Sequence, residues 1–382
     1  MSNATLTTDL LKSRQHFEIL DGLRGVAAIS VVVFHFMEWV HFDYSKNFIG
    51  HGFLAVDFFF CLSGFVIGYA YDNRIRTMGT KEFFKSRLIR LHPLVVLGAI
   101  LGVLGFLFDP LSNDANSYSS GMIALLFACT VLLIPFPVME DRAFNLFGLN
   151  APSWSLFWEY IANIAYAFIL CKLKRRTLLA VALVSAAALC FIGIRSGNLM
   201  GGWSKASIAD GGVRVAFSFV AGLLIYRSNW IIKNRLGFLG ISALLVVAFV
   251  MPFFKWNWLV EVVMVVIYFP LLVSLGAGSA LSVKTRKACV FSGDISYPLY
   301  MTHYAWIWLF GSYLKRYAPG TGELVVVITL GTIGLIGLSY LMLKVYDQPI
   351  RRYLTNRRQQ KMKEKEAIRA KAATACAAQN SK

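Results

Sequence analysis

Ionisable side chains that could do chemistry occur inside the apolar stretches of this 382-residue sequence. Arg24 and His35 share the first stretch, with ten residues between them. At about 100° per residue, a helix places both on one face, about 16 Å apart along its axis. His35 could accept a proton near neutral pH, whereas Arg24 stays charged and could bind an anion. The alternatives are that Arg24 extends to the lipid headgroups and that His35 only packs.

Two arginines and a glutamate extend this set. Arg87 and Arg90 are three positions apart, so a helix places them on one face, where their planar guanidinium groups could bind phosphate oxygens in pairs. Binding of lipid headgroups is the alternative. Glu159 shares a helix face with Ser155 and lies inside an apolar run, where a carboxylate needs a partner because its burial is costly. The alternative is that Glu159 has only a packing role.

Six polar or aromatic residues within or beside the apolar runs are candidates for contacts with a substrate. They are Asp57, Ser63, Trp154, Ser155, Tyr297 and His303. Asp57 could instead be a helix-end carboxylate in water, and Tyr297 could anchor its helix at the membrane interface.

The composition shows which elements must position these side chains. The chain is 57% hydrophobic and 15% charged, whereas soluble domains carry about 25% charged residues. A soluble enzyme and a disordered chain are thereby excluded. The net charge of +18 would suggest nucleic acid as the partner of a soluble protein, but the basic residues lie in short connections between apolar runs and near the C-terminus. The sequence therefore predicts a multi-pass membrane protein with no nucleic-acid partner.

The apolar runs predict an all-α transmembrane bundle of about ten spanning helices, each able to cross about 30 Å of hydrocarbon. The run at 121–138 ends in Ile134-Pro135-Phe136-Pro137, which breaks a helix, so we expect a re-entrant or interfacial hairpin on the outer side. Both termini and most basic clusters are then cytoplasmic. A single run is expected at 293–314.

The charge pattern divides the chain into three segments. These are a cytoplasmic segment at 1–16, a transmembrane domain at 17–350 and a basic cytoplasmic tail at 351–382. The tail is expected to form a helix on the anionic inner surface of the membrane. The six cysteines are scattered without a C-x-x-C pair, so no disulfide framework, no metal site and no permanently bound cofactor are expected.

Six segments, in this order, resemble the acyltransferase-3 family of bacterial integral-membrane O-acyltransferases. They are LDGLRG at 20–25, followed by the Arg-x10-His pair, AVDFFFCLSGF at 55–65, RLIRLHPL at 87–94, PSWSLFWEY at 152–160, GDISYPLYMTH at 293–303 and DQPIRR at 347–352. The resemblance covers residues 17 to 353, so the domain at 17–350 is expected to be the acyltransferase domain. The family commonly has a second acidic residue after the position of Glu159, whereas Tyr160 follows it here.

The resemblance implies a multi-pass protein of the bacterial inner membrane that transfers an acyl group, most often acetyl, from cytoplasmic acyl-CoA to a carbohydrate or glycoconjugate. It also implies that Arg24 and His35 form the functional core. Acyl transfer to an alcohol needs a base and stabilisation of an oxyanion. We therefore expect His35 as the base, with Arg24 and Glu159 also in the catalytic site. Arg24, Arg87 and Arg90 are expected to hold the CoA phosphates, and direct transfer is favoured over an acyl-enzyme.

Two other classes of protein fit part of the pattern. A polytopic transporter or flippase of a lipid-linked or exported sugar would also bury charges in a bundle, but such proteins often contain internal repeats, and none is clear here. A membrane lipid acyltransferase of another fold could use a buried histidine, but it does not account for the segments at 55–65 and 153–156. Binding of CoA by the purified protein distinguishes an acyltransferase from a transporter.

Overall fold

The computed structural model describes the backbone of residues 17–379 and the side chains as far as residue 364. The expected segment at 1–16 lies outside the described residues. The described part of the chain is helical and contains no strand, so the predicted helical bundle is confirmed. Eight of its helical segments are long and apolar enough to cross a membrane.

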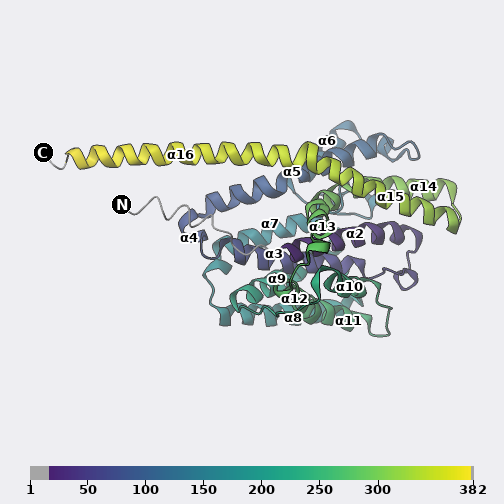
Figure 1. Cartoon of the computed structure of the whole chain (residues 1–382). Helices are drawn as coiled ribbons and strands as arrows, with labels where there is room; N and C mark the ends of the chain where they lie inside the picture. Colours follow the sequence, from purple (N-terminus) through teal and green to yellow (C-terminus); the bar gives the residue numbers. More distant parts are fainter. Residues whose placement is uncertain (1–16, 380–382) are drawn as a thin grey trace.

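The helices lie side by side as a bundle, with α16 extending from one end (Figure 1). We call the end from which α16 extends the basic end. In chain order the helices are α2 (Glu18–Val40), α3 (Ala55–Tyr71), α4 (Ile75–Met78), α5 (Thr80–Leu107), α6 (Ser120–Leu132), α7 (Ser153–Phe168), α8 (Arg175–Ser196), α9 (Ile208–Arg227), α10 (Gly237–Val250), α11 (Asn257–Val263), α12 (Phe269–Gly278), α13 (Val283–Thr302), α14 (Tyr304–Tyr317), α15 (Thr321–Met342) and α16 (Gln348–Gln379).

The part of the basic tail that the structure describes is helical, and its expected place on the membrane surface stays a prediction. A single π-helical turn, Leu343–Asp347, joins α15 to α16 without a break. The backbone stays helical through this turn but changes direction there, and α16 then projects from the bundle (Figure 1).

The segment expected to form a hairpin contains only a short helix. At 13 residues, α6 is about 20 Å long, less than the hydrocarbon thickness of about 30 Å. It ends at Leu133, whose φ of 53° is left-handed. The chain then folds back, because the Phe136 N–H donates to the carbonyl of Leu146, and the Leu146 N–H donates to the carbonyl of Trp203. The segment therefore folds back on itself, and its re-entrant or interfacial position in the membrane stays a prediction.

The run expected at 293–314 forms two helices instead of one. The first, α13, begins at Val283 and ends at Thr302, and α14 begins at Tyr304. The apolar pattern missed the first half of α13 because that half carries Lys284, Arg286 and Lys287. It packs along α2, where the exposed Arg286 pairs with Glu18 at 2.7 Å, and this contact accompanies the extension of the helix beyond the apolar run.

Glycines allow α3 and α9 to cross at very short range. A Cβ atom at Gly64 of α3 would clash with the carbonyl oxygen of Phe219, and one at Gly222 of α9 would clash with the carbonyl oxygen of Cys61. Small residues of this kind let the backbones of membrane helices approach closely. The crossing holds α3, which contributes to the cavities described below, against α9.

We predict that Gly222→Val disrupts the fold, because the new side chain would have to displace backbone atoms of α3. Overpacking of this kind costs at least about 1–3 kcal/mol. The measurement is the folded fraction and unfolding temperature of detergent-purified protein. The matched control is Gly334→Val on α15, where an added Cβ atom would have no neighbour within 4 Å, so this variant should behave as wild type. Equal unfolding temperatures for the two variants would contradict the close crossing.

Candidate active site

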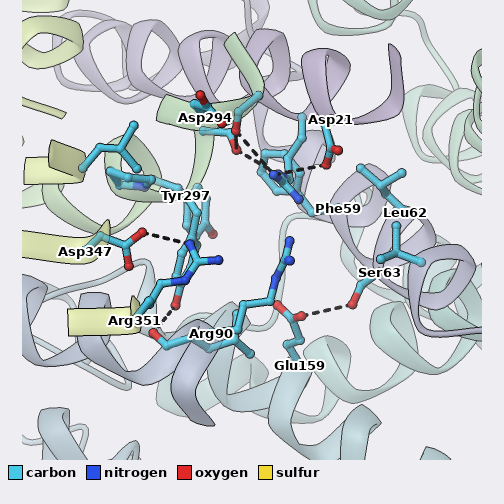
Figure 2. Close-up of a pocket in the computed structure, with 18 of the residues that line it drawn as sticks. Asp21, Phe59, Leu62, Ser63, Arg90, Glu159, Asp294, Tyr297, Asp347 and Arg351 are labelled. Atoms are coloured by element: carbon cyan, nitrogen blue, oxygen red, sulfur yellow. Dashed lines mark hydrogen bonds and ion pairs between the residues drawn. The ribbon is translucent and has the colours of Figure 1, made fainter. Parts of the chain in front are cut away.

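A cavity of about 690 Å³ lies among α2, α3, α5, α7, α13 and the start of α16. Figure 2 shows charged side chains from these helices around it. We call it the arginine cavity because five arginines line it. They are Arg24, Arg87, Arg90, Arg351 and Arg352. Five carboxylates line it too, namely Glu18, Asp21, Glu159, Asp294 and Asp347, so any attraction for an anion depends on which arginines are already paired.

Arg87 and Glu159 form an ion pair in the wall of the arginine cavity. Nη2 of Arg87 lies 2.7 Å from Oε1 of Glu159, and the hydroxyl of Ser63 donates to the same oxygen at 3.0 Å. Arg87 is buried, whereas Glu159 and Ser63 are half-buried. These three predicted residues therefore come together from α5, α7 and α3.

Arg24 joins α2 to α13 at another wall of this cavity. Its Nε donates to the hydroxyl of Ser296 at 2.8 Å, and Nη2 lies 3.3 Å from a carboxylate oxygen of Asp21. Tyr297, which also lines the cavity, donates its hydroxyl proton to the carbonyl of Leu91 at 2.7 Å. Arg24 thus faces the cavity while it is held in place by neighbouring side chains.

Two arginines of the cavity remain available for an anion. Among the residues whose side chains are described, Arg90 and Arg352 form no ion pair, whereas Arg351 pairs with Asp347 at 3.0 Å. A guanidinium in a partly enclosed cavity gains from a charged hydrogen-bond acceptor, and phosphate oxygens match its geometry. Arg90 and Arg352, on α5 and α16, are therefore the strongest candidates for holding a phosphate group.

His35 lies in a second, smaller cavity of about 100 Å³. We call this the histidine cavity; it is lined by His35, Glu38, Tyr44, Trp154, Trp203 and Tyr304, among others. Nδ1 of His35 lies 3.1 Å from Oε2 of Glu38, and each side chain is 20% exposed. Because a carboxylate can only accept at that nitrogen, we assign the proton of a neutral ring to Nδ1. Nε2 is then the nitrogen able to accept a proton from a substrate.

Aromatic rings hold His35 in place. Its ring stacks on that of His303 at a centroid distance of 5.4 Å and meets Tyr304 edge-on at 4.8 Å. His303 is completely buried and its Nδ1 lies 3.0 Å from the carbonyl oxygen of Leu299. His303 lines neither cavity, so the structure places it behind His35 and not at a substrate surface.

The two cavities are separated by a thin wall of side chains. Val56 and Tyr300 line both cavities. The hydroxyl of Tyr300 hydrogen-bonds to the hydroxyl of Ser155 at 2.8 Å, and Ser155 lines the arginine cavity while its neighbour Trp154 lines the histidine cavity. Val56 and Tyr300 therefore lie between the two spaces.

Asp57, expected to contact a substrate, is instead committed to a buried ion pair. Its carboxylate is 0% exposed and lies 2.6 Å from Nη2 of Arg214, which is 1% exposed. Asp57 lines neither cavity. Since a buried carboxylate is stable only when it is paired, this arrangement gives Asp57 a structural role in joining α3 to α9.

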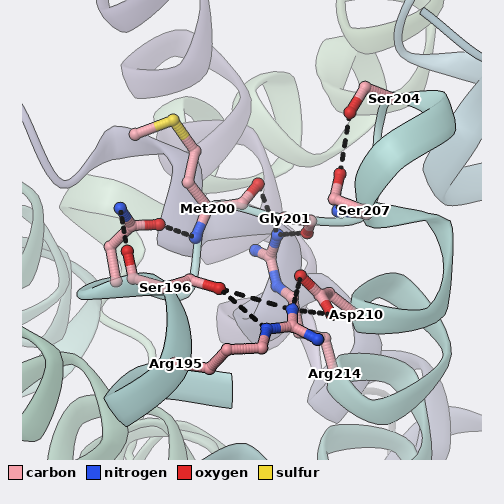
Figure 3. A network of polar contacts seen from close by, with 10 residues as sticks. Arg195, Ser196, Met200, Gly201, Ser204, Ser207, Asp210 and Arg214 are labelled. Atoms are coloured by element: carbon pink, nitrogen blue, oxygen red, sulfur yellow. Dashed lines mark hydrogen bonds and ion pairs between the residues drawn. The ribbon is translucent and has the colours of Figure 1, made fainter.

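The same arginine holds the connection between α8 and α9 (Figure 3). Nη1 of Arg214 donates to the carbonyl of Gly201 at 2.8 Å, and Arg195 at the end of α8 pairs with Asp210 at 2.7 Å. Met200 and Trp203 of this connection line the histidine cavity. The network therefore fixes one wall of that cavity.

Several residues at these cavities were not among the sequence-predicted site residues. Glu38 follows His35 by three positions, a spacing that places both on one helix face and could have indicated the pair. Tyr300 was visible only as an aromatic beside the predicted Tyr297. Arg351 and Arg352 belong to the DQPIRR segment at 347–352 but fall in the part expected to be a peripheral tail.

Comparison with known proteins assigns the chain to a family. The family model described as an acyltransferase domain matches residues 17–344. A protein of Rhizobium radiobacter named Protein 2 in picA locus is 34% identical over 162 residues, which cover 40% of this chain and 82% of that protein. No solved structure gives a significant match.

Two further relatives have names that state an activity. The peptidoglycan O-acetyltransferase OatA of Listeria monocytogenes is 28% identical over 169 residues, 42% of this chain. The O-acetyltransferase OatA of Staphylococcus aureus is 36% identical over 96 residues, 24% of this chain. The matched parts span 25% and 14% of those two longer proteins. The match covers the whole histidine cavity and the walls that α2, α3, α5, α7 and α13 give to the arginine cavity, and it ends before Arg351 and Arg352. Because the family model covers most of the chain, the protein belongs to the acyltransferase-3 family of integral-membrane acyltransferases.

Proposed function

We propose that this protein transfers an acyl group, most often acetyl, from cytoplasmic acyl-CoA to a hydroxyl of a carbohydrate or glycoconjugate, in the bacterial inner membrane. The observation that carries the proposal is a histidine–carboxylate pair, His35 and Glu38, one thin wall away from an arginine-lined cavity. The names of the two OatA relatives support O-acetyl transfer to a glycan.

The arginine cavity is the proposed site of the acyl donor. Its volume of about 690 Å³ is within the range of about 300–1,000 Å³ that is usual for ligand pockets. Coenzyme A carries a diphosphate and a 3′-phosphate, and Arg90 with Arg352 would bind these groups, supported by Arg24. The pantetheine arm would then extend along α2 from Arg24 towards His35. On this assignment the basic end of the bundle faces the cytoplasm, where acyl-CoA is found.

The histidine cavity is the proposed site of the acceptor hydroxyl. At about 100 Å³ it is too small for a whole sugar, so one edge of the acceptor would enter while the rest stays outside. Trp154, Trp203 and Tyr304 offer flat apolar surfaces to the ring, and their polar tips offer hydrogen bonds.

The proposed reaction is a direct transfer between the two cavities. Nε2 of His35 takes the proton of the acceptor hydroxyl as its oxygen attacks the thioester carbonyl. The new C–O bond forms, the C–S bond breaks, and the proton on His35 passes to the leaving CoA thiolate. Glu38 stabilises the imidazolium that exists between these two proton transfers. The carbonyl carbon must reach the acceptor past Val56 and Tyr300.

We predict that His35→Gln reduces acyl transfer by about 10²–10⁴-fold, the usual contribution of a general base. Glutamine keeps the size and polarity of the side chain but cannot take the proton. The measurement is CoA release from acetyl-CoA in membranes that contain the acceptor. His41→Gln, just beyond the end of α2, is the matched control and should retain activity. Full activity of the His35 variant would refute the role of general base.

For Glu38→Gln we expect a lower kcat, by about tenfold or more, with an unchanged KM for acyl-CoA. The amide can still hydrogen-bond to Nδ1 but no longer stabilises a charged imidazolium. Steady-state kinetics over a range of acyl-CoA concentrations separates the two parameters. A change in KM alone would show that Glu38 acts on donor binding and does not position His35.

Arg90→Ala should weaken CoA binding by about tenfold or more, since a hydrogen bond to a charged group contributes about 1.5–3 kcal/mol. Isothermal titration of the purified protein with CoA measures the affinity. Arg235→Ala removes an exposed cation from the connection between α9 and α10 and serves as the charge-matched control. The same affinity in both variants would mean that the phosphates are held elsewhere.

A further inference from the structure

A second large space, a groove of about 720 Å³, lies between α5 and the beginning of α16. Lys85, Ile89 and His92 of α5 line this groove, whereas Arg87 and Arg90 line the arginine cavity. At about 100° per residue these two sets occupy opposite faces of α5. The groove is therefore separate from the proposed active site and shares two helices with it.

The walls of the groove are apolar over most of its length. Leu88, Ile89, Pro93 and Val96 line it from α5, and Ile350 and Leu354 line it from the other side. Leu88 is 44% exposed although it lies in a helix long and apolar enough to span the membrane. Such a surface at the rim of a bundle meets hydrocarbon chains.

Cationic groups gather at the end of the groove nearest the projecting part of α16. They are Lys85, Arg357, Arg358 and Lys361, and one carboxylate, Glu82, lies among them. Glu82 already accepts from Lys85 at 2.6 Å and from Arg358 at 2.9 Å. Among the residues whose side chains are described, Arg357 and Lys361 form no ion pair. The groove therefore combines an uncompensated positive end with an apolar floor.

We propose that this groove binds one anionic glycerophospholipid from the leaflet at the basic end. Its phosphate lies at Arg357 and Lys361, and an acyl chain follows Leu88, Pro93 and Val96 towards the membrane centre. Basic pockets between membrane helices bind anionic headgroups in this way. The acyl chains of a zwitterionic lipid also fit the apolar part of the groove, but the cation of its headgroup would be repelled by the basic residues. A free phosphate matches the positive end but leaves the apolar floor uncovered.

The bound lipid would hold the beginning of α16 against α5. The Glu82–Arg358 ion pair already links these helices. A lipid whose phosphate lies at Arg357 and Lys361 of α16, and whose acyl chain packs on the apolar side chains of α5, adds a second link. The first turns of α16, just before Arg357, contain Arg351 and Arg352, which line the arginine cavity. An anionic lipid thereby stabilises the wall that contains these arginines, which makes the groove a candidate site of lipid-dependent stability.

The test is a titration of the delipidated full-length protein with phosphatidylglycerol, followed by native mass spectrometry and by the unfolding temperature. We expect one tightly retained copy and a larger rise in unfolding temperature than with phosphatidylcholine. The double variant Arg357→Ala/Lys361→Ala should bind phosphatidylglycerol about 30-fold more weakly, since each cation near an anionic lipid contributes about 1 kcal/mol. The double variant Lys233→Ala/Arg235→Ala, with the same charge change in an exposed connection, should bind as wild type.

A second variant keeps the inference testable if the first does not fold. Leu354→Trp fills the apolar floor without altering any charge and should displace the retained lipid. Equal phosphatidylglycerol binding by the wild type and by a folded groove variant would overturn the inference. Equal stabilisation by glycerol 3-phosphate would also overturn it, because that compound carries the charge without the chains. Neither outcome bears on the proposed acyl transfer, since none of these residues lines the arginine or histidine cavity.

Discussion

A charge buried among membrane helices has to be paired, and the ion pair between Arg87 and Glu159 meets this constraint where α3, α5 and α7 converge. The pair has two consequences. It ties three helices together at one wall of the arginine cavity, and it neutralises Glu159 so that this carboxylate does not compete for Arg90. Loss of either partner would leave a charge without compensation in a place from which water is largely excluded. Arg90 is therefore available for an anion because Arg87, and not Arg90, pairs with Glu159.

The same rule distinguishes structural from potentially reactive charges elsewhere. Asp57 is fully buried and lines neither cavity, whereas Arg214 reaches the wall of the histidine cavity. Arg214 is committed to Asp57 and to the carbonyl of Gly201, so the pair joins α3 to α9 and holds the connection between α8 and α9. His35 and Glu38 are also paired, but each remains partly exposed to a cavity. A titratable side chain that keeps access to a cavity can exchange a proton there, whereas the sealed carboxylate of Asp57 supports the fold.

Much of the candidate site could be found from residue types and spacing, because the spacing of two residues in a helix sets whether their side chains lie on the same face. Arg24, Arg87, Arg90, Ser63, Ser155, Tyr297 and Glu159 all line the arginine cavity, and His35 and Trp154 line the histidine cavity. Asp57 and His303 could not be separated from these residues in the sequence. Their spacing equally suggests a functional face, and only the partner helices show that one is sealed by Arg214 and the other lies behind His35. Arg351 and Arg352 were missed because their basic surroundings are typical of a peripheral tail.

The sequence by itself determined the membrane class, the helical architecture and the family resemblance, since hydropathy, charge placement and motif order are properties of the chain alone. It also showed that α6 would be short, because two prolines follow it closely. The tertiary structure decided that the predicted residues are divided between two cavities, and that Val56 and Tyr300 line both of them. It likewise decided that α13 extends beyond its apolar half and that α16 follows α15 through a π-helical turn without a break. The physical reason is that a cavity, a partner for a charge and a shield from lipid are all supplied by other helices, and no local pattern in one helix specifies which neighbour will supply them.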